Sequence, residues 1–162
     1  MASTKTAKTL KITINESIKL NGTEQGSTNT FNIASISSIY KRIVTVPAST
    51  DTTIAVFKST TGVADSAFDI DNVRYIRVTN LDDTNGVNLS VQIDTGEDDS
   101  GSDQSFTHQL DPGRSFLLGE PHDKTAVDDD SGGIVTTKHD IESILVDSGS
   151  SDVDVEIFIA SL

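Results

Sequence analysis

Apolar and polar residues alternate along most of this chain, and this pattern restricts the possible folds more than any other feature of the sequence. In residues 10–20 every apolar side chain, from Leu10 to Leu20, occupies an even-numbered position. Successive side chains of a β-strand point to opposite faces of its sheet, so this alternation predicts a half-buried strand. Apolar residues follow the spacing of a helix in residues 32–42. This segment is rich in serine and isoleucine, which have weak helix propensity, so we expect at most one short helical turn there.

Turn signals divide the rest of the chain into further strands. An Asn-Gly pair at 21–22 supplies the two positive-φ residues of a type I′ turn, so we expect the chain to double back towards Phe31 and Ile33. A polar loop at 80–86 predicts one hairpin, and Asp-Pro-Gly-Arg at 111–114 predicts a type II turn that closes a second hairpin. The other expected strands are residues 40–46, 53–58, 73–79, 87–93, 106–110, 115–118, 133–137, 141–146 and 153–159.

These strands predict an all-β fold, an antiparallel β-sandwich or jelly roll of about 8–10 strands with little or no helix. We expect one domain over residues 10–162, preceded by a mobile basic arm at residues 1–9. The opening residues lack the apolar stretch of a secretory signal, and no run approaches the ~20 apolar residues of a transmembrane helix. We therefore expect a chain that is made in the cytoplasm.

The net charge of the chain is -13, and it is unevenly distributed. Residues 1–42 carry a net charge of +4, and residues 43–162 carry a net charge of -17. Such an acidic body repels nucleic acid phosphates and anionic lipids, so we expect neither nucleic acid nor a membrane as the main partner. A basic amino end on an acidic body indicates a polarised molecule, with one end suited to docking on an assembly.

Basic residues are the candidates for contact with a partner. Those in or beside the basic arm lie in a segment rich in Ser, Thr and Ala, and the other two are isolated cations in the acidic body. These candidates are Lys5, Lys8, Lys11, Arg74 and Arg77. The two arginines either dock on a partner subunit or form ion pairs with aspartates of neighbouring loops, namely Asp71, Asp82 and Asp83.

Metal ligands and cofactor motifs are weakly represented. Acidic runs at 97–103 and 128–133 offer oxygen ligands that calcium prefers, but neither follows the spacing of an EF-hand loop. His139 and Glu142 would face opposite sides of a strand, so they could not share a metal ion without a bulge. The chain has no cysteine. We expect no bound metal and no cofactor.

Catalytic motifs are also absent from the sequence. No G-x-S-x-G elbow and no glycine-rich phosphate loop occurs, so we expect no enzymatic activity. Sugar-binding sandwiches usually stack glycan rings on exposed aromatic side chains. This chain has no tryptophan and two tyrosines, Tyr40 and Tyr75, which weakens the interpretation as a sugar-binding module.

Two segments of the chain together resemble a pattern found in virion proteins. The first is VRYIRVTNLDDTNGV at residues 73–87, a strand and polar loop, and the second is LDPGRSFLL at residues 110–118, a turn. This pair is similar to small virion structural proteins of tailed phages, particularly those that infect marine cyanobacteria. The resemblance covers residues 73–118 and implies a β-sandwich on the outside of a virion, either a capsid cement or decoration protein or a tail-associated piece.

The resemblance and the charge distribution together lead to an expected function. We expect a non-enzymatic phage virion structural protein, a capsid decoration or cement protein bound to the capsid surface through its N-terminal region. Its expected partners are the major capsid protein or other virion proteins, and we expect a homo-oligomer. The alternative is a carbohydrate- or receptor-binding β-sandwich module of a tail or host-adhesion structure.

Overall fold

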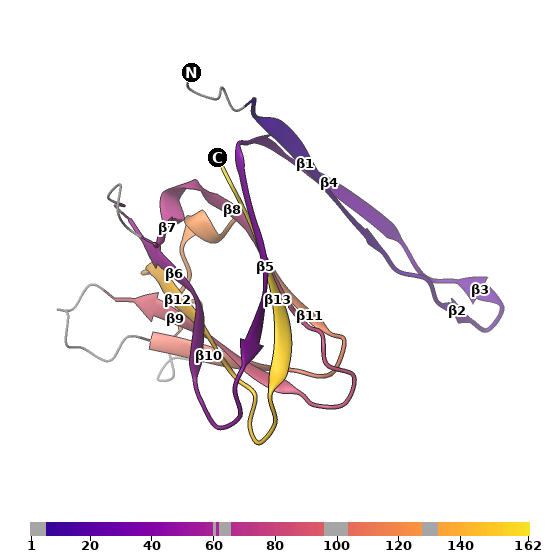
Figure 1. Cartoon of the computed structure of the whole chain (residues 1–162). Helices are drawn as coiled ribbons and strands as arrows, with labels where there is room; N and C mark the ends of the chain where they lie inside the picture. The colour runs from indigo at the N-terminus through magenta and orange to yellow at the C-terminus, as the bar shows by residue number, and fades with distance from the viewer. Residues whose placement is uncertain (1–5, 60, 62–65, 96–103, 128–132) are drawn as a thin grey trace.

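The computed structural model describes residues 6–59, 61, 66–95, 104–127 and 133–162. In these residues two sheets pack face to face as a β-sandwich, and a long β-hairpin extends away from them (Figure 1). The helices of the described residues are two short 3-10 turns, η1 (Ile70–Asn72) and η2 (Pro121–Asp123). The all-β class predicted from the alternation is confirmed.

One sheet of the sandwich has five strands and the other has four. The five-stranded sheet contains, in spatial order, β10 (Gln104–Leu110), β9 (Val87–Asp94), β12 (Asp140–Asp147), β6 (Thr52–Lys58) and β7 (Phe68–Asp69). The four-stranded sheet contains, in spatial order, β11 (Ser115–Gly119), β8 (Val73–Asn80), β13 (Val153–Ser161) and β5 (Ser38–Val46). Neighbouring strands pair antiparallel except β6 and β7, which are parallel.

The hydrophobic core lies between the two sheets. It is built from the inward-facing side of each alternating strand, and the four-residue rows of β9 and β13 are buried along their whole length. These rows are Val87, Leu89, Val91 and Ile93 on β9, and Val153, Val155, Ile157 and Ile159 on β13. Full burial of one such side chain stabilises the fold by about 1.5–3 kcal/mol, so the alternation is the main source of stability.

Both predicted hairpins are wrong, although the chain reverses direction where it was expected to. β8 and β9 belong to different sheets, and so do β10 and β11. The type II turn between β10 and β11 is present, with Gly113 at φ 69° and a hydrogen bond of 3.0 Å from Arg114 N to Asp111 O. The apolar rows of both strands in each pair point into the core, so the strands face each other across the sandwich instead of sharing a sheet.

A buried asparagine ties these two connections together. Asn80, at the end of β8, is fully buried, and its Nδ2 donates hydrogen bonds to Asn85 O at 2.8 Å and to Leu110 O at 3.2 Å. Its Oδ1 accepts a hydrogen bond from the backbone N–H of Asp82 at 3.0 Å. Its own backbone N–H donates to Arg114 O at 2.9 Å. One amide group therefore holds the loop after β8 against the turn after β10.

The hairpin outside the sandwich is formed by β1 (Lys8–Asn15) and β4 (Thr28–Ile36). Its far end carries the short pair β2 (Lys19–Leu20) and β3 (Thr23–Glu24), joined through Asn21 and Gly22. The predicted type I′ turn is confirmed, because these two residues have φ of 51° and 80°. We call residues 8–36 the arm. In Figure 1 the arm runs away from the sandwich, and its tip touches neither sheet.

Three other expectations differ from the structure. Residues 133–137 form no strand, and the pairing near them is a single isolated bridge between Thr125 and His139. Residues 32–42, the helical candidate, form the end of β4 and the start of β5. The division expected between residues 9 and 10 does not coincide with a break, because Lys8 already belongs to β1.

The helix-like spacing of residues 32–42 has a local explanation. Ser35 has a positive φ of 64°, which interrupts the regular alternation of the strand. Ile33 and Ile36 are both buried in the same cluster, although they are three residues apart. A bend in a strand has therefore produced the periodicity of a helix.

Replacing Asn80 with alanine should destabilise the protein by about 2–4 kcal/mol, because two carbonyl oxygens and one N–H lose their buried partner. Chemical denaturation measures this difference. As a matched control, Asn88→Ala removes an exposed amide from β9, the next strand along the chain, and should change stability by less than about 0.5 kcal/mol. Equal effects of the two substitutions would contradict the role given to Asn80.

Candidate docking surface

The arm has one apolar face and one polar face. In the register of β1 and β4, Leu10 lies opposite Ile33 and Ile12 lies opposite Phe31, and Ile14 continues the same face. The opposite face is polar throughout and consists of Lys11, Thr13, Asn15, Thr28, Thr30 and Asn32. A two-stranded ribbon of this kind is only marginally stable in water unless its apolar face is covered.

The apolar face of the arm is covered where the arm meets the sandwich. Ile33 and Ile36 are each 6% exposed and pack with Tyr75 and Ala160, which lie on the outer face of the four-stranded sheet. The same cluster contains four partly buried side chains, Leu10, Ile12, Phe31 and Phe158. The base of the arm is thus anchored to its own sandwich by a second, smaller hydrophobic core.

Beyond this base the apolar side chains of the arm are exposed. Ile14 is 42% exposed, Ile18 50% and Leu20 54%. They belong to the part of the arm that extends away from the sandwich in Figure 1. The distal arm therefore presents three large aliphatic side chains that are about half exposed.

Polar contacts define the conformation of the tip. Glu24 Oε1 accepts hydrogen bonds from the backbone N–H groups of Ile18 at 3.0 Å and Gly26 at 2.9 Å. Ser27 Oγ donates to Glu16 Oε2 at 2.9 Å. A Cβ on Gly26 would lie 2.0 Å from the carbonyl oxygen of Glu16, so only glycine fits there. The exposed aliphatic groups are consequently displayed on a defined scaffold.

The outer face of the four-stranded sheet is open beyond the arm base. The strand registers place Leu117, Arg77, Phe158 and Lys41 in one row across it. The next row away from the arm base contains Ser115, Thr79, Glu156 and Ile43. Leu117 is 45% exposed, Ile43 56% and, at the sheet edge, Ile39 50%. This face thus combines a charged centre with aliphatic side chains at its two edges.

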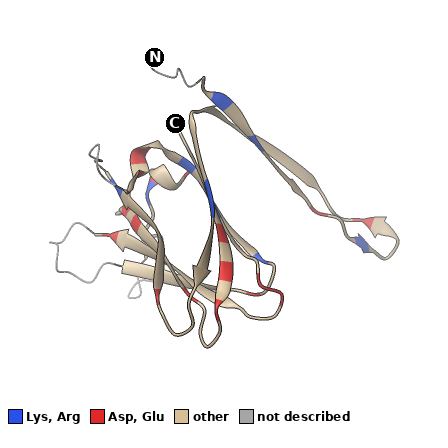
Figure 2. Cartoon of the chain, in the orientation of Figure 1, with Lys and Arg blue, Asp and Glu red and all other residues tan. Residues whose placement is uncertain are grey.

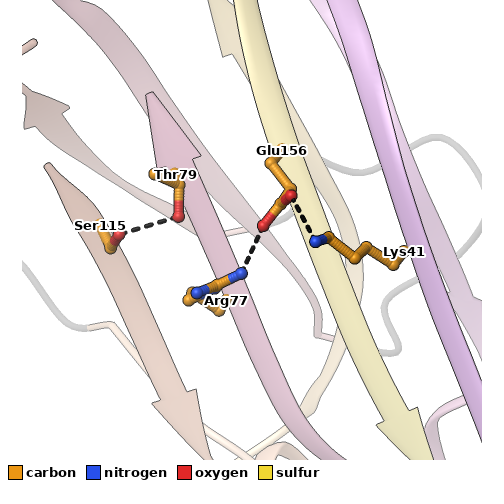
Figure 3. Close-up of polar contacts among 5 residues, drawn as sticks. All are labelled: Lys41, Arg77, Thr79, Ser115 and Glu156. Carbon is orange, nitrogen blue, oxygen red and sulfur yellow. Dashed lines mark hydrogen bonds and ion pairs between the residues drawn. The ribbon is translucent and has the colours of Figure 1, made fainter. Parts of the chain in front are cut away.

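An ion-pair network occupies the centre of this face (Figure 3). Glu156 contacts Lys41 Nζ at 3.0 Å and also pairs with the Arg77 guanidinium. The Arg77 guanidinium also lies over the Phe158 ring, 5.8 Å from its centroid. Thr79 and Ser115 share a hydrogen bond of 2.8 Å beside the network. The cation Arg77 is therefore neutralised within the chain, by a residue that the sequence analysis did not name.

The other candidate cations have different surroundings. Lys5 lies outside the described residues. Lys8 and Lys11 are exposed on β1, with no ion pair to any described residue. Arg74 Nη1 donates to the backbone carbonyl oxygens of Asp71 at 2.7 Å and Val73 at 3.2 Å. The arm lysines are therefore free to meet a partner, whereas both arginines are held within the chain.

An acidic pocket of about 540 Å³ adjoins the far end of the same sheet face. Its carboxylates come from two loops and from β13, and its lining residues are Thr45, Leu81, Asp82, Asp83, Asp152 and Asp154. None of these four aspartates forms an ion pair with a described residue. Leu81, which is 45% exposed, supplies an aliphatic surface beside them. Two of these aspartates, Asp82 and Asp83, were expected from the sequence only as possible ion-pair partners of the arginines.

Asp82 has a further structural role in this pocket. Its Oδ1 accepts hydrogen bonds from the backbone N–H groups of Asn85 at 2.6 Å and Thr84 at 2.7 Å. These hydrogen bonds stabilise the ionised carboxylate and therefore lower the pKa of Asp82. The bond from Asn85 has the largest effect, and the bond from Thr84 has the next largest. The Asp82 carboxyl therefore stays ionised to a lower pH than an ordinary aspartate.

The structure brings one group of possible metal ligands together that the sequence analysis did not. Side-chain atoms of Glu120, His122 and Asp123 lie within 4.8 Å of one another. His122 lies between the two carboxylates, at 3.3 Å from Glu120 and 3.5 Å from Asp123. Histidine–carboxylate contacts account for this arrangement, and we assign no metal to it. The two acidic runs considered for calcium, residues 97–103 and 128–133, lie outside the described residues except for Gly133.

Tyr75 is buried and Tyr40 is partly buried. The Tyr75 ring lies under the arm base, 6.0 Å from Phe158, and the Tyr40 ring packs edge-on against Phe68 at 5.1 Å. Tyr75 is 6% exposed, so its ring offers no open face on which a sugar could stack. A groove of about 280 Å³ on the five-stranded sheet is lined mainly by polar residues, namely Asp51, Asn88, Ser90, Gln92, Thr107, Leu145 and Asp147.

Comparisons with known proteins add little to this geometry. No protein-family model matches the chain, and no curated protein matches it. A solved chain from Bacillus endospore appendages, described as disulfide-linked pili, aligns over 76% of this chain and 88% of its own length. The identity is 9% and the TM-score 0.36, which is too low to carry an argument. Within the described residues, no helix has the length and hydrophobicity needed to cross a bilayer.

The ionisation of Tyr75 reports whether the arm base covers the sheet. Burial raises the pKa of Tyr75 above its ordinary value of about 10, and the nearby charge of Arg77 partly opposes this. In a Tyr40→Phe background, absorbance titration should show one tyrosine with a raised pKa. Adding Ile33→Ala should bring that pKa down towards 10, because it opens the arm base.

Ile14→Ala is the matched control, since it removes an aliphatic side chain from the exposed part of the arm. It should leave the titration of Tyr75 unchanged. A raised folded-state pKa also means that this group's contribution to stability is complete below pH 10 and is lost as the pH rises further. An ordinary pKa for Tyr75 in the intact protein would contradict the burial under the arm.

Proposed function

We propose that this chain is a non-enzymatic structural protein of a phage virion, a capsid decoration or cement protein. In this role its N-terminal region attaches it to the capsid surface, and its acidic sandwich faces water. Its partner is then the major capsid protein or another virion protein. The resemblance of residues 73–118 to virion structural proteins of tailed phages supplies the class of assembly.

The observation that carries this proposal is the arm itself. Figure 2 shows lysines along the arm together with glutamates towards its tip, and mainly acidic residues over the sandwich and its loops. Lys8 and Lys11 are exposed, have no ion pair to a described residue, and lie on an element that extends away from the body. Such an element gains most of its stability from what it docks against, as expected for a subunit of a larger assembly.

Pockets and shifted pKa values are the features in which a catalytic site would be sought. The acidic pocket and the polar groove are lined by hydroxyl, amide, carboxylate and leucine side chains. The described titratable side chains with shifted pKa values, Tyr75 and Asp82, have structural explanations in packing and in a turn. Neither is arranged with a nucleophile or with a second group of displaced pKa.

The carbohydrate- or receptor-binding module remains the second proposal. The polar groove on the five-stranded sheet favours it, since carboxylate and amide side chains hydrogen-bond sugar hydroxyls. It has less support than the first, because Tyr75 is buried and Tyr40 is partly buried against Phe68.

Reversing the charge of the arm lysines tests the first proposal. The wild-type protein should co-sediment with empty capsids of the corresponding tailed phage. The double variant Lys8→Glu/Lys11→Glu should bind at least about tenfold more weakly, since like charges then oppose each other across the interface. Both side chains are exposed, so the variant should fold normally.

The matched control is Lys138→Glu, which makes the same change at an exposed position on the sandwich. It should bind capsids like the wild type. Absence of wild-type co-sedimentation would overturn the assignment to the capsid. Unchanged binding by the double variant would overturn the role of the arm lysines.

A further inference from the structure

We propose that Asn21 is a site of spontaneous deamidation in the folded protein, and that hydrogen bonds protect the second Asn-Gly pair of the chain from the same reaction. In this reaction the side-chain amide of an asparagine becomes a carboxylate without an enzyme or a cofactor. The inference goes beyond the proposed function, because it concerns the chemistry of the arm tip and not what the arm binds.

The chain contains Asn-Gly pairs at residues 21–22 and 85–86. The backbone nitrogen that follows an asparagine can attack the side-chain carbonyl carbon and close a five-membered ring. A glycine at the second position makes this attack easiest, because it has no side chain to obstruct the approach. Sequence alone therefore gives the two pairs the same reactivity, and only the structure distinguishes them.

The reaction needs no reagent other than water. The nitrogen of Gly22 loses its proton and forms a bond to Cγ of Asn21, and the Cγ–Nδ2 bond breaks so that Nδ2 leaves as ammonia. Water then opens the cyclic imide at either of its two carbonyl carbons. One opening gives aspartate, and the other gives isoaspartate, in which the main chain continues through the side-chain carbon. Each product carries an additional negative charge at neutral pH.

Asn21 and Gly22 are free to reach the geometry of attack. Both residues are exposed at the tip of the arm, in the turn between β2 and β3. Neither the Asn21 side chain nor the Gly22 N–H has a hydrogen-bond partner among the described residues. A Cβ built on Gly22 would have no described atom within 4 Å other than those of its chain neighbours. Rotation of the peptide unit between the two residues therefore displaces no neighbouring side chain.

The second pair is held by hydrogen bonds to its reacting groups. Asp82 Oδ1 accepts from the Asn85 backbone N–H at 2.6 Å and from Asn85 Nδ2 at 3.3 Å. The Asn85 carbonyl, which belongs to the same peptide unit as the attacking nitrogen, accepts from Asn80 Nδ2 at 2.8 Å. Gly86 packs beside Leu110, whose carbonyl oxygen would lie 3.4 Å from a Cβ built there. Attack at Asn85 therefore requires this network to open first.

Deamidation at Asn21 changes the surface of the arm tip. The tip already carries Glu16 and Glu24, so a further carboxylate makes it more acidic. The isoaspartyl product also adds a carbon atom to the main chain, which the two-residue type I′ turn cannot accommodate. The pairing of β2 with β3 then loses its register, and Leu20 loses its fixed position. The arm tip thus changes with age, whereas the loop after β8 does not.

Peptide mapping of the full chain tests this inference. The folded protein is incubated for days at mildly alkaline pH, and the peptides that contain the two Asn-Gly pairs are followed by mass spectrometry. The peptide with Asn21 should gain about one mass unit and separate into an aspartyl and an isoaspartyl form. It should react at least about tenfold faster than the peptide with Asn85, since the latter reaction requires local opening.

The same incubation in denaturant separates structure from sequence. Both peptides should then react at similar rates, because the hydrogen bonds around Asn85 are lost. Equal rates in the folded protein, or no reaction at Asn21, would overturn the inference. Protection of Asn85 that persists in denaturant would also overturn it, since the folded structure would then not be the cause.

The variant Asp82→Ala tests the cause of the protection while the rest of the chain stays folded, as circular dichroism can check. It removes both hydrogen bonds from Asn85 to this carboxylate and should speed deamidation at Asn85 by about tenfold. The matched control Asp83→Ala removes the adjacent carboxylate, which accepts from Thr84 Oγ1 at 2.9 Å, and should leave the rate at Asn85 unchanged. Equal rates in the two variants would contradict the role given to Asp82.

The experiment uses the isolated chain, so its result is independent of capsid binding. An Asn21 that does not react refutes this inference and leaves the proposed function standing. A chain that deamidates at Asn21 and never co-sediments with capsids refutes the capsid assignment and leaves this inference standing.

Discussion

The apolar rows of β8 and β9 face each other across the core, and the position of the rest of the chain depends on this burial. A strand pair that shares a sheet is joined by a tight turn, but a pair that faces across a core needs a connection that spans the distance of about 10 Å between the sheets. The loop after β8 and the turn after β10 both make such crossings. Asn80 lies where they meet, and its buried amide gives each a hydrogen-bond partner.

This constraint explains which parts of the fold could be predicted from the sequence. Alternation identified the strands of the sandwich, because each strand buries one face whichever neighbour it pairs with. It did not identify the pairing, and the two expected hairpins were wrong because a turn signal states only that the chain reverses. Residues 133–137 illustrate the converse error, since β-branched residues alone form no strand where no neighbouring strand is available.

The candidate docking surface was only partly visible in the sequence. The even-numbered apolar positions from Leu10 to Leu20 and the Asn-Gly turn correctly indicated a hairpin with one apolar face. They did not indicate that the sandwich covers this face at its base alone, because cover depends on where the chain bends from β4 of the arm into β5 of the sandwich, at Ser35 and Ser37. The acidic pocket combines aspartates that lie about 70 residues apart, a proximity that no local pattern can reveal.

The arm is therefore anchored at its base and half exposed along its length, and the central claim is that its own sandwich covers only this base. Amide hydrogen exchange on the full chain tests this claim most directly. The account predicts slow exchange for the paired amides of the arm base, around Leu10 and Ile33, and fast exchange for the amides from Ile14 to Leu20. Equal protection along the whole arm would contradict it.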